Sequence, residues 1–243
     1  MLTPSSSPSL LLALALTGCA LTLGGCLSNG AEPGDSAPAG DSDEPTDPPP
    51  AGLRELPPPR EQSATSLERS LADRHSVRSF TDEVLTEQEI SQLLWSAQGI
   101  NRSWGGRTAP SAGAKYPIEL FLVTAAETLH YVPDGHRASQ VATTDLRPAL
   151  MAAGLDQMAI GDAPAVLVVT GVVARTAEKY GDRAERYVFM EAGHVAQNVL
   201  LQAVALGLGG VPIGAFTDAE VSQVLGLPDG QIPLYLIPVG HED

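Results

Sequence analysis

The segment RHSVR, residues 74–78, places an arginine or a serine at every second position. Residues two apart point to the same side of an extended backbone, so Arg74, Ser76 and Arg78 share one face. Because guanidinium groups are planar, permanently charged hydrogen-bond donors, this face suits a phosphate group. A solvated basic patch that pairs with nearby acids is the alternative.

Two other short segments carry residues that could take part in chemistry. From Arg107 to Pro117 the sequence RTAPSAGAKYP sets small residues between prolines, which lets a backbone approach a flat ligand closely. A turn-rich loop without a ligand fits this pattern equally well. Lys179 and Tyr180 could transfer a proton if they were partly buried, whereas an exposed lysine at a helix end is the simpler arrangement.

Composition and motifs exclude several other classes of site. The chain has 14 Lys+Arg against 29 Asp+Glu, a net charge of −15, whereas nucleic-acid binding depends on basic residues that neutralise phosphates. Both cysteines lie in the first 26 residues, so the body has no disulfide framework, zinc cage or cysteine nucleophile. Glu191 and His194 have the spacing of di-iron bundles, but the second such pair is missing and we expect no metal site.

The elements that must position these residues give helix and strand signals in an order that predicts an α+β fold. Thr86 with Glu89 forms a capping-box pattern, and Thr217 with Glu220 repeats it. A helix from about Arg183 to Leu206 is apolar nearly all round in its second half, so we expect a central or subunit-interface helix. Further helices are expected at 66–73, 86–99, 146–155 and 217–225, and strands at 118–124, 128–132, 165–173 and 232–239.

Residues 1–26 are predicted to be a lipoprotein-type signal peptide. The apolar run Leu10–Leu23 is short for a membrane span and suits an export signal. Cys26 and Cys19 each end a sequence that resembles a lipobox, and we favour Cys26 as the lipidated residue because polar sequence follows it directly. An ordinary secretory signal is the alternative. The prediction is an exported lipoprotein, anchored to a membrane and facing the periplasm or the cell surface.

Residues 27–63 differ in composition from the rest of the chain. They mix Pro, Gly and Ser with eight acidic residues and two arginines, so they can bury little and are expected to form a disordered tether. All eleven aromatic residues follow this segment. The folded domain is therefore expected to span residues 64–243.

Taken in order, six segments of this domain resemble the nitroreductase superfamily, and specifically its SagB-type dehydrogenase branch, which includes thiazoline and oxazoline oxidases. The segments are RHSVRSF (74–80), ISQLLWSAQGI (90–100), RTAPSAGAKYP (107–117), EKYGDRAERY (178–187), EAGHVAQNVLLQAVALGLGG (191–210) and PIGAF (212–216). The resemblance implies a mixed sheet flanked by helices and a homodimer formed through long central helices, with two FMN molecules at the subunit interface. It also implies a small-molecule substrate, with NAD(P)H as a candidate electron donor.

The resemblance also assigns residues to the FMN site. The phosphate would be held by Arg74, His75, Ser76 and Arg78. The partner subunit's loop would reach the flavin ring through Pro110, Ser111, Ala112 and Gly113, and flavin N5 would face the backbone of Ile213, Gly214 and Ala215. Lys179 and Tyr180 stand where azoline-oxidising members have a proton-transferring pair.

Two features depart from the family pattern. Nitroreductases often have a basic residue near the C-terminus that adds to the phosphate site, whereas this chain ends in VGHED, where His241 is the candidate substitute. An exported SagB-type enzyme also could not easily share a cytoplasmic cyclodehydratase partner. We therefore expect an FMN-dependent oxidoreductase with an undefined small substrate. The alternative is a flavin-binding or redox-sensing surface lipoprotein without turnover.

Overall fold

The structure is a computed structural model that describes residues 52–243. The expected signal peptide with Cys19 and Cys26, and residues 27–51 of the expected tether, lie outside the described residues. Within the described part, no helix combines the length and the apolar character needed to cross a membrane.

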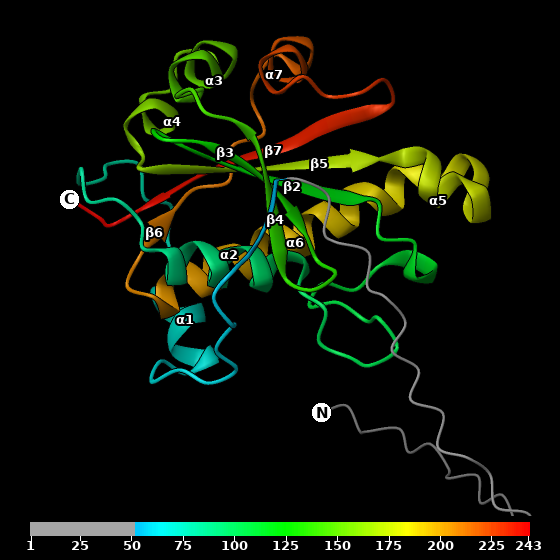
Figure 1. Cartoon of the computed structure of the whole chain (residues 1–243), viewed down its shortest axis with the longest axis horizontal. Coiled ribbons are helices and arrows are strands. Elements are labelled where there is room, and N and C mark those ends of the chain that lie inside the picture. Colours follow the sequence, from blue (N-terminus) through cyan, green and yellow to red (C-terminus); the bar gives the residue numbers. More distant parts are fainter. Residues whose placement is uncertain (1–51) are drawn as a thin grey trace, which may run out of the picture. The chain divides into compact units, whose positions relative to one another are not determined.

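One seven-stranded sheet forms the centre of the described residues (Figure 1). Its strand order is β1-β4-β3-β2-β5-β7-β6, and every pair of neighbouring strands is antiparallel. The strands are β1 (Leu53–Glu55), β2 (Ile118–Thr124), β3 (Thr128–Val132), β4 (Arg137–Ala142), β5 (Ala165–Val172), β6 (Gly209–Gly210) and β7 (Gln231–Gly240). The expected mixed sheet is thus antiparallel in its named strands, because short connections join β2 to β3 and β3 to β4, and the parallel pairing is confined to an isolated bridge between Ser76 and Gly210.

Helices cover both faces of the sheet. Figure 1 shows α3, α4 and α7 above it, and α1, α2 and α6 below. The helices are α1 (Leu67–Asp73), α2 (Glu87–Gln98), α3 (Arg147–Ala153), α4 (Met158–Asp162), α5 (Val173–Tyr180), α6 (Ala184–Ala205) and α7 (Asp218–Leu225). Each face has its own core, because alternate residues of β2 and β5 point to opposite sides of the sheet. The predicted α+β fold is confirmed.

The long helix α6 matches the expected central helix. Val188, Val195 and Val199 are fully buried against the sheet and α2. On the same helix, Phe189 and Met190 are 49% and 47% exposed. One side of α6 therefore supports the core, and another side leaves apolar surface in water.

Of the two capping boxes predicted from the sequence, one is present in the structure and one is absent. The Thr86 hydroxyl accepts from Glu89 N, and the Glu89 carboxylate accepts from Thr86 N at 2.7 Å, which confirms the capping box at α2. Thr217 stands at the start of α7 but its side chain makes no capping hydrogen bond, so the second expected capping box is wrong. The pattern of residue types alone cannot distinguish the two cases, since capping depends on the side-chain rotamer.

The folded unit begins before residue 64, where the sequence analysis placed the end of the tether. Leu53–Glu55 pairs with β4, and Leu56 is 6% exposed. The buried Gln92 amide accepts from Arg60 N at 2.7 Å and donates to Arg60 O at 3.0 Å. The sequence does not reveal this strand, because the prolines at 57–59 give the segment the composition of a tether.

Shortening the chain to residues 64–243 should therefore destabilise it. The change removes Leu56, whose burial contributes roughly 1.5–3 kcal/mol. It also leaves the Gln92 amide oxygen without the Arg60 N donor, at a cost of about 1–3 kcal/mol, while Gln92 Nε2 keeps its hydrogen bond to Gln202. We expect a lower free energy of unfolding in urea than for residues 52–243. Leu56→Ala in the longer chain should lose only the first contribution, and equal stability of the two lengths would contradict the prediction.

Candidate functional site

The segment 74–78 leaves α1 and runs beside β6. Ser76 forms a parallel bridge with Gly210, and Val77 N donates to Gly210 O at 3.2 Å. Val77 is buried while Ser76 and Arg78 are exposed, and Arg74 is half-buried at the end of α1. The expected two-residue alternation is therefore present over residues 76–78, whereas His75 is exposed as well.

Glycine permits the close contact between this segment and β6. A Cβ atom on Gly209 would lie 2.5 Å from Cγ2 of Val77, a distance that side chains cannot tolerate. The contact aligns two extended backbones beside the exposed Arg78 and Ser76 side chains. Two guanidinium groups, a hydroxyl and a narrow backbone cradle are suitable donors for a phosphate group, so the residues present fit the phosphate end of FMN.

The two histidines near this segment face carboxylates. His75 lies 3.1 Å from Glu242 through Nε2 and 3.0 Å from Asp73 O through Nδ1. The hydrogen bond to Asp73 O, and then the Glu242 carboxylate, raises the pKa of His75. His241 lies 3.7 Å from Glu83 and 3.9 Å from Glu89. The expected substitute for the missing C-terminal base is therefore paired with acids.

The segment 213–215 offers an open strip of backbone. Ile213 N donates to Leu236 O at 2.8 Å, which fixes the strip against β7. Gly214 and Ala215 are exposed, and a Cβ on Gly214 would approach the protein only at 3.9 Å, at Tyr235 Cε1. Gln157 Nε2 donates to Ala215 O at 2.8 Å, so the uncovered backbone is centred on Gly214. A flat ring could lie against Gly214 without displacing a side chain.

The structure brings together two groups that the sequence analysis treated separately. Gly113 has φ +61° within the turn Ala112–Ala114, and a Cβ at this position would lie 2.9 Å from Tyr180 Oη and 3.1 Å from Lys179 Nζ. Lys179 is exposed and Tyr180 is half-buried at the end of α5, with Pro110 exposed and Ser111 half-buried in the same loop. Lys179, Tyr180 and the loop 110–113 form one cluster.

This cluster and the 74–78 segment lie at opposite ends of α6. Tyr180 contacts Tyr187 in the first turns of α6, with ring centroids 5.0 Å apart. Gly210 lies near Leu200, close to the other end of the helix. A helix of 22 residues is about 33 Å long. Figure 1 shows α5 and β6 correspondingly far apart along α6.

A buried polar cluster supports the loop 107–113, and the sequence analysis did not find it. Glu191 is 2% exposed and accepts from Gln98 Nε2 at 3.4 Å, while Arg107 Nη1 donates to Gln98 Oε1 at 3.0 Å. Burial raises the pKa of Glu191, and the hydrogen bonds from Ser111 and Gln98 oppose that shift. The available signal was the position of Glu191 on the apolar face of α6, three residues after Val188.

Metal binding has no support in this part of the chain. Glu191 is buried whereas His194, three residues later, is exposed. The described residues contain no group of three or more His, Cys, Asp or Glu side chains that could hold a metal ion.

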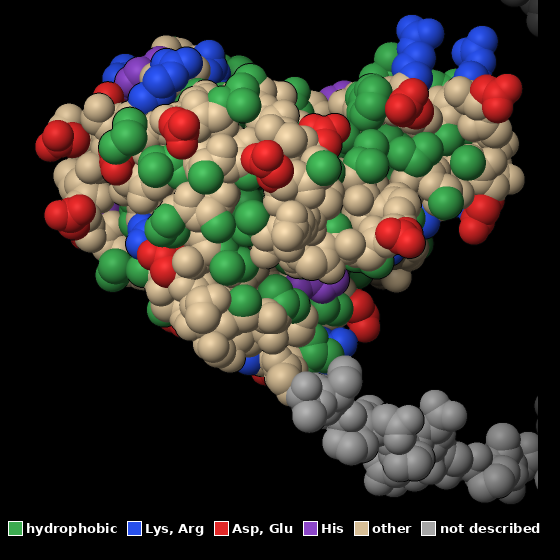
Figure 2. All heavy atoms as spheres, turned by 90° about the horizontal axis from the view of Figure 1, so that it is seen from above, with side chains coloured by type: hydrophobic (Ala, Val, Ile, Leu, Met, Phe, Trp, Pro, Cys, Tyr) green, Lys and Arg blue, Asp and Glu red, His purple; other side chains and the backbone are tan. Residues whose placement is uncertain are grey.

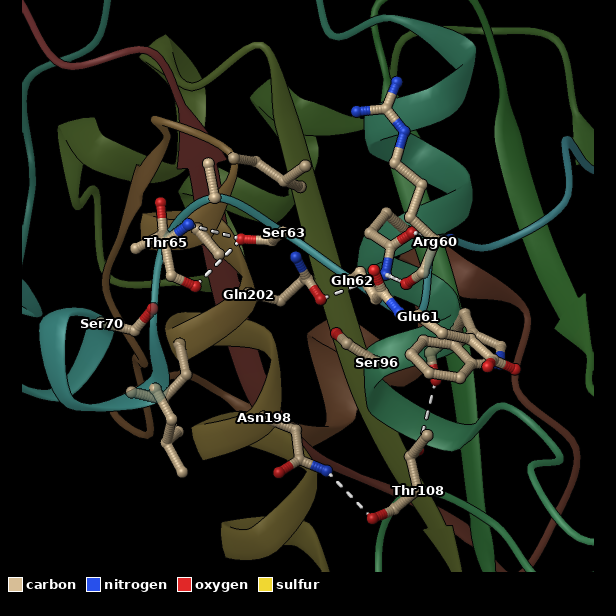
Figure 3. Close-up of a pocket in the computed structure, with 17 residues that line it drawn as sticks. Arg60, Glu61, Gln62, Ser63, Thr65, Ser70, Ser96, Thr108, Asn198 and Gln202 are labelled. Atoms are coloured by element: carbon tan, nitrogen blue, oxygen red, sulfur yellow. Dashed lines mark hydrogen bonds between the residues drawn. The ribbon is translucent and has the colours of Figure 1, made fainter.

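Pockets open on the described surface, and two of them can be compared with the expected site. The larger, of about 590 Å³, lies between the segment 60–65, α1, α2 and α6 (Figure 3). Gln202, Ser96, Asn198 and Thr108 are among its polar lining side chains, and it contains none of the expected flavin-site residues. The smaller, of about 450 Å³, includes Pro110 and Ser111. Of these two pockets, the smaller is therefore the better candidate for the functional site, because it includes residues expected at the flavin.

Comparison with known proteins finds one matching family. The sequence profile of the Nitroreductase family matches residues 71–241 of this chain. A Methanocaldococcus jannaschii protein described as a nitroreductase is 42% identical over 182 residues, which cover 72% of this chain and 91% of that protein. The FMN reductase (NAD(P)H) of Bacillus subtilis is 26% identical over 188 residues, or 71% of this chain and 64% of that enzyme.

A third relative comes from Escherichia coli. The microcin B17-processing protein McbC is 30% identical over 132 residues, which cover 50% of this chain and 48% of that protein. A chain of the solved E. coli microcin synthetase complex has a TM-score of 0.61 and 28% identity, with 72% of this chain and 73% of that chain covered.

The buried Glu191 carboxyl should give a pH-dependent contribution to stability. Its pKa is raised above the usual 4.5, so the folded protein binds this proton more tightly than the unfolded chain. Its contribution is therefore complete below the unfolded pKa and is lost as the pH rises through the folded pKa. Glu191→Gln removes this loss, and we expect its free energy of unfolding to rise relative to wild type as the pH rises above 4.5.

Urea unfolding of both proteins at a series of pH values tests this. Glu178→Gln is a sign control, because the Lys115 ion pair lowers the pKa of the exposed Glu178 and its removal should show no such rise. A constant difference between wild type and Glu191→Gln at every pH would refute the assignment.

Proposed function

This chain belongs to the nitroreductase family, and we propose that it is an FMN-dependent oxidoreductase that acts on a small organic substrate, with NAD(P)H as a candidate electron donor. The observation that carries the proposal is the face formed by Arg74, Ser76 and Arg78 beside β6. Neither arginine has an ion pair within residues 52–243. Both guanidinium groups are therefore free to hold the FMN phosphate.

We propose that two protomers form each flavin site. The cluster of Gly113, Lys179 and Tyr180 lies at the opposite end of α6 from the 74–78 segment, so a twofold axis across α6 would bring one protomer's loop to the other's phosphate face. The half-exposed Phe189 and Met190 on α6 supply apolar surface for that contact. The family resemblance supports the same homodimer.

Bound FMN would accept or donate a hydride or electrons, and the protein would supply position and protons. The backbone of Ile213, Gly214 and Ala215 would lie against the ring, with its most open point at Gly214 and the Gln157 side chain beside Ala215 O. Lys179 Nζ lies 5.4 Å from the Tyr180 ring centroid, and both groups contact the Gly113 loop. We assign to this pair the transfer of a proton to or from the substrate.

The substrate class stays broad in this proposal. The likeness to McbC, a microcin B17-processing protein, supports a SagB-type relationship. The role of Lys179 and Tyr180 rests on the resemblance to azoline-oxidising members. Azoline oxidation is not our preferred activity, because the predicted export signal separates this chain from cytoplasmic partners. Lipidation at Cys26 and attachment to a membrane also stay proposals, and mass spectrometry of the mature N-terminus would test them.

The decisive experiment is the visible spectrum of purified residues 27–243. We expect a yellow dimer that releases FMN on denaturation and is reduced by NADH or NADPH without oxygen. Flavin that is bound but never turned over would favour the redox-sensing alternative. A colourless protein that does not bind added FMN would overturn the proposal.

Exchange between two inactive variants tests the shared site. Arg74→Ala with Arg78→Ala removes the phosphate face, and Gly113→Val blocks the loop, so each homodimer should lose FMN. In a mixed dimer one site combines both defects and the other has none, so random exchange should restore about a quarter of wild-type flavin. Tagged subunits verify that mixed dimers form, and mixed dimers without flavin would refute the shared site.

The role of the Lys179–Tyr180 pair predicts a difference between the two half-reactions. Lys179→Met and Tyr180→Phe should keep flavin and its reduction by NAD(P)H, but should slow reduction of 4-nitrobenzoate roughly 10²–10⁴-fold, since that step consumes protons. Stopped-flow absorbance separates the two rates. Arg183→Gln, on the exposed turn that follows, is the control. An equal loss in both half-reactions would assign the pair to binding instead.

A further inference from the structure

The smaller pocket is basic in an acidic protein. It lies between the turn 101–106 and the segment 107–116, has a volume of about 450 Å³, and is lined by only two charged side chains, Arg102 and Arg107. The chain as a whole carries a net charge of −15. Volumes of this size are typical of small-molecule sites. A pocket whose charged lining side chains are all cationic attracts anions.

Two aromatic side chains line the same pocket. Trp104 is 72% exposed, and a Cβ on Gly106 would lie 2.5 Å from its Cη2 atom, so glycine allows the indole to lie directly on the backbone. Tyr116 has φ +46°, a left-handed conformation that costs roughly 1–2 kcal/mol. Ser111 Oγ accepts from Tyr116 N at 2.8 Å and holds this conformation. Strained backbone and exposed indole are both features of ligand sites.

The Arg107 guanidinium has unused binding capacity. Its carbon lies 4.4 Å from the Tyr116 ring centroid, and it donates one hydrogen bond, to Gln98. No carboxylate within residues 52–243 forms an ion pair with it. Loss of hydration lowers its pKa, and the more distant Glu119 and Glu191 only partly oppose that shift. Arg102 donates only to the neighbouring Asn101 O, at 2.8 Å. An anion in the pocket would compensate the buried charge of Arg107.

We propose that this pocket binds a planar conjugated carboxylate, with the carboxylate on Arg107 and Arg102 and the ring against Trp104 and Tyr116. The inference rests on the proposed function, because Pro110 and Ser111 line the pocket and belong to the loop that we place beside the partner's flavin. It identifies the chemical class of the organic substrate.

Calorimetry with simple ligands tests this assignment on residues 27–243. Benzoate carries both recognised features, benzamide lacks the charge, and acetate lacks the ring. We expect benzoate to bind roughly tenfold more tightly than either, since a charge-assisted contact and an aromatic contact each contribute at this level. Added salt should weaken benzoate binding and leave benzamide binding unchanged.

Matched variants locate the binding. Arg102→Gln and Trp104→Leu change exposed side chains and should each weaken benzoate binding about tenfold. Arg107→Gln should weaken it at least as much, and circular dichroism shows whether that variant is folded. Arg137→Gln, at the turn between β3 and β4, is the control and should have no effect.

Two outcomes would overturn the assignment: equal affinity for benzoate and benzamide, or benzoate binding that neither Arg102→Gln nor Trp104→Leu changes. Flavin content is measured in the same samples. Loss of flavin with benzoate selectivity intact would refute the proposed function but keep the pocket assignment. Flavin retention without benzoate selectivity would refute the pocket assignment alone.

Discussion

The helix α6 imposes the constraint on which the other elements depend. It is apolar nearly all round over its second half, and such a helix is stable in water only when most of its surface is covered. The sheet and α2 cover one side, where Val188, Val195 and Val199 are fully buried. Phe189 and Met190 stay half-exposed on another side. The same helix separates the phosphate face at one end from the Lys179–Tyr180 cluster at the other. A partner that covered the exposed side of α6 could therefore also complete the site.

Two glycines, Gly209 and Gly113, allow both halves of the candidate site to form because they have no side chain. At one end, Val77 packs where a Cβ on Gly209 would stand, and this contact places Ser76 and Arg78 at the surface. At the other end, Lys179 and Tyr180 approach a loop that only Gly113 leaves open. In both places a glycine brings two segments close that are distant in the sequence. Close backbone contacts therefore place these residues, and the buried Glu191–Gln98–Arg107 cluster adds side-chain support to the loop 107–113.

The sequence is informative where local physics determines the structure. The Thr86 capping box and the apolar run of β5 each depend on neighbouring residues, and each is found as expected. The alternation expected in RHSVR is found over residues 76–78. The segment 53–60 could not be found in this way, because its order depends on long-range contacts with β4 and Gln92. The buried hydrogen bonds that join Glu191, Gln98 and Arg107 could not be predicted either, since Glu191 is distant in the sequence from the other two residues. Dimerisation and the flavin-site roles were inferred from family resemblance, which local patterns cannot replace.

The distribution of charge links the two halves of the site. Figure 2 shows arginine and histidine side chains gathered at the end of the body that carries β6 and the C-terminus in Figure 1, and further basic side chains at the opposite end. Guanidinium groups that form no ion pair within residues 52–243 occur there, at Arg74 and Arg78, and again at Arg102 and Arg107 in the smaller pocket. In an acidic protein, unpaired arginines would readily find carboxylates unless the fold kept the carboxylates away. The fold keeps carboxylates beyond ion-pair distance of these arginines within residues 52–243, although Glu191 is linked to Arg107 through Gln98. In the twofold dimer that we propose, the two places would adjoin. One would bind the phosphate of FMN, and the other would bind an anionic substrate beside the ring.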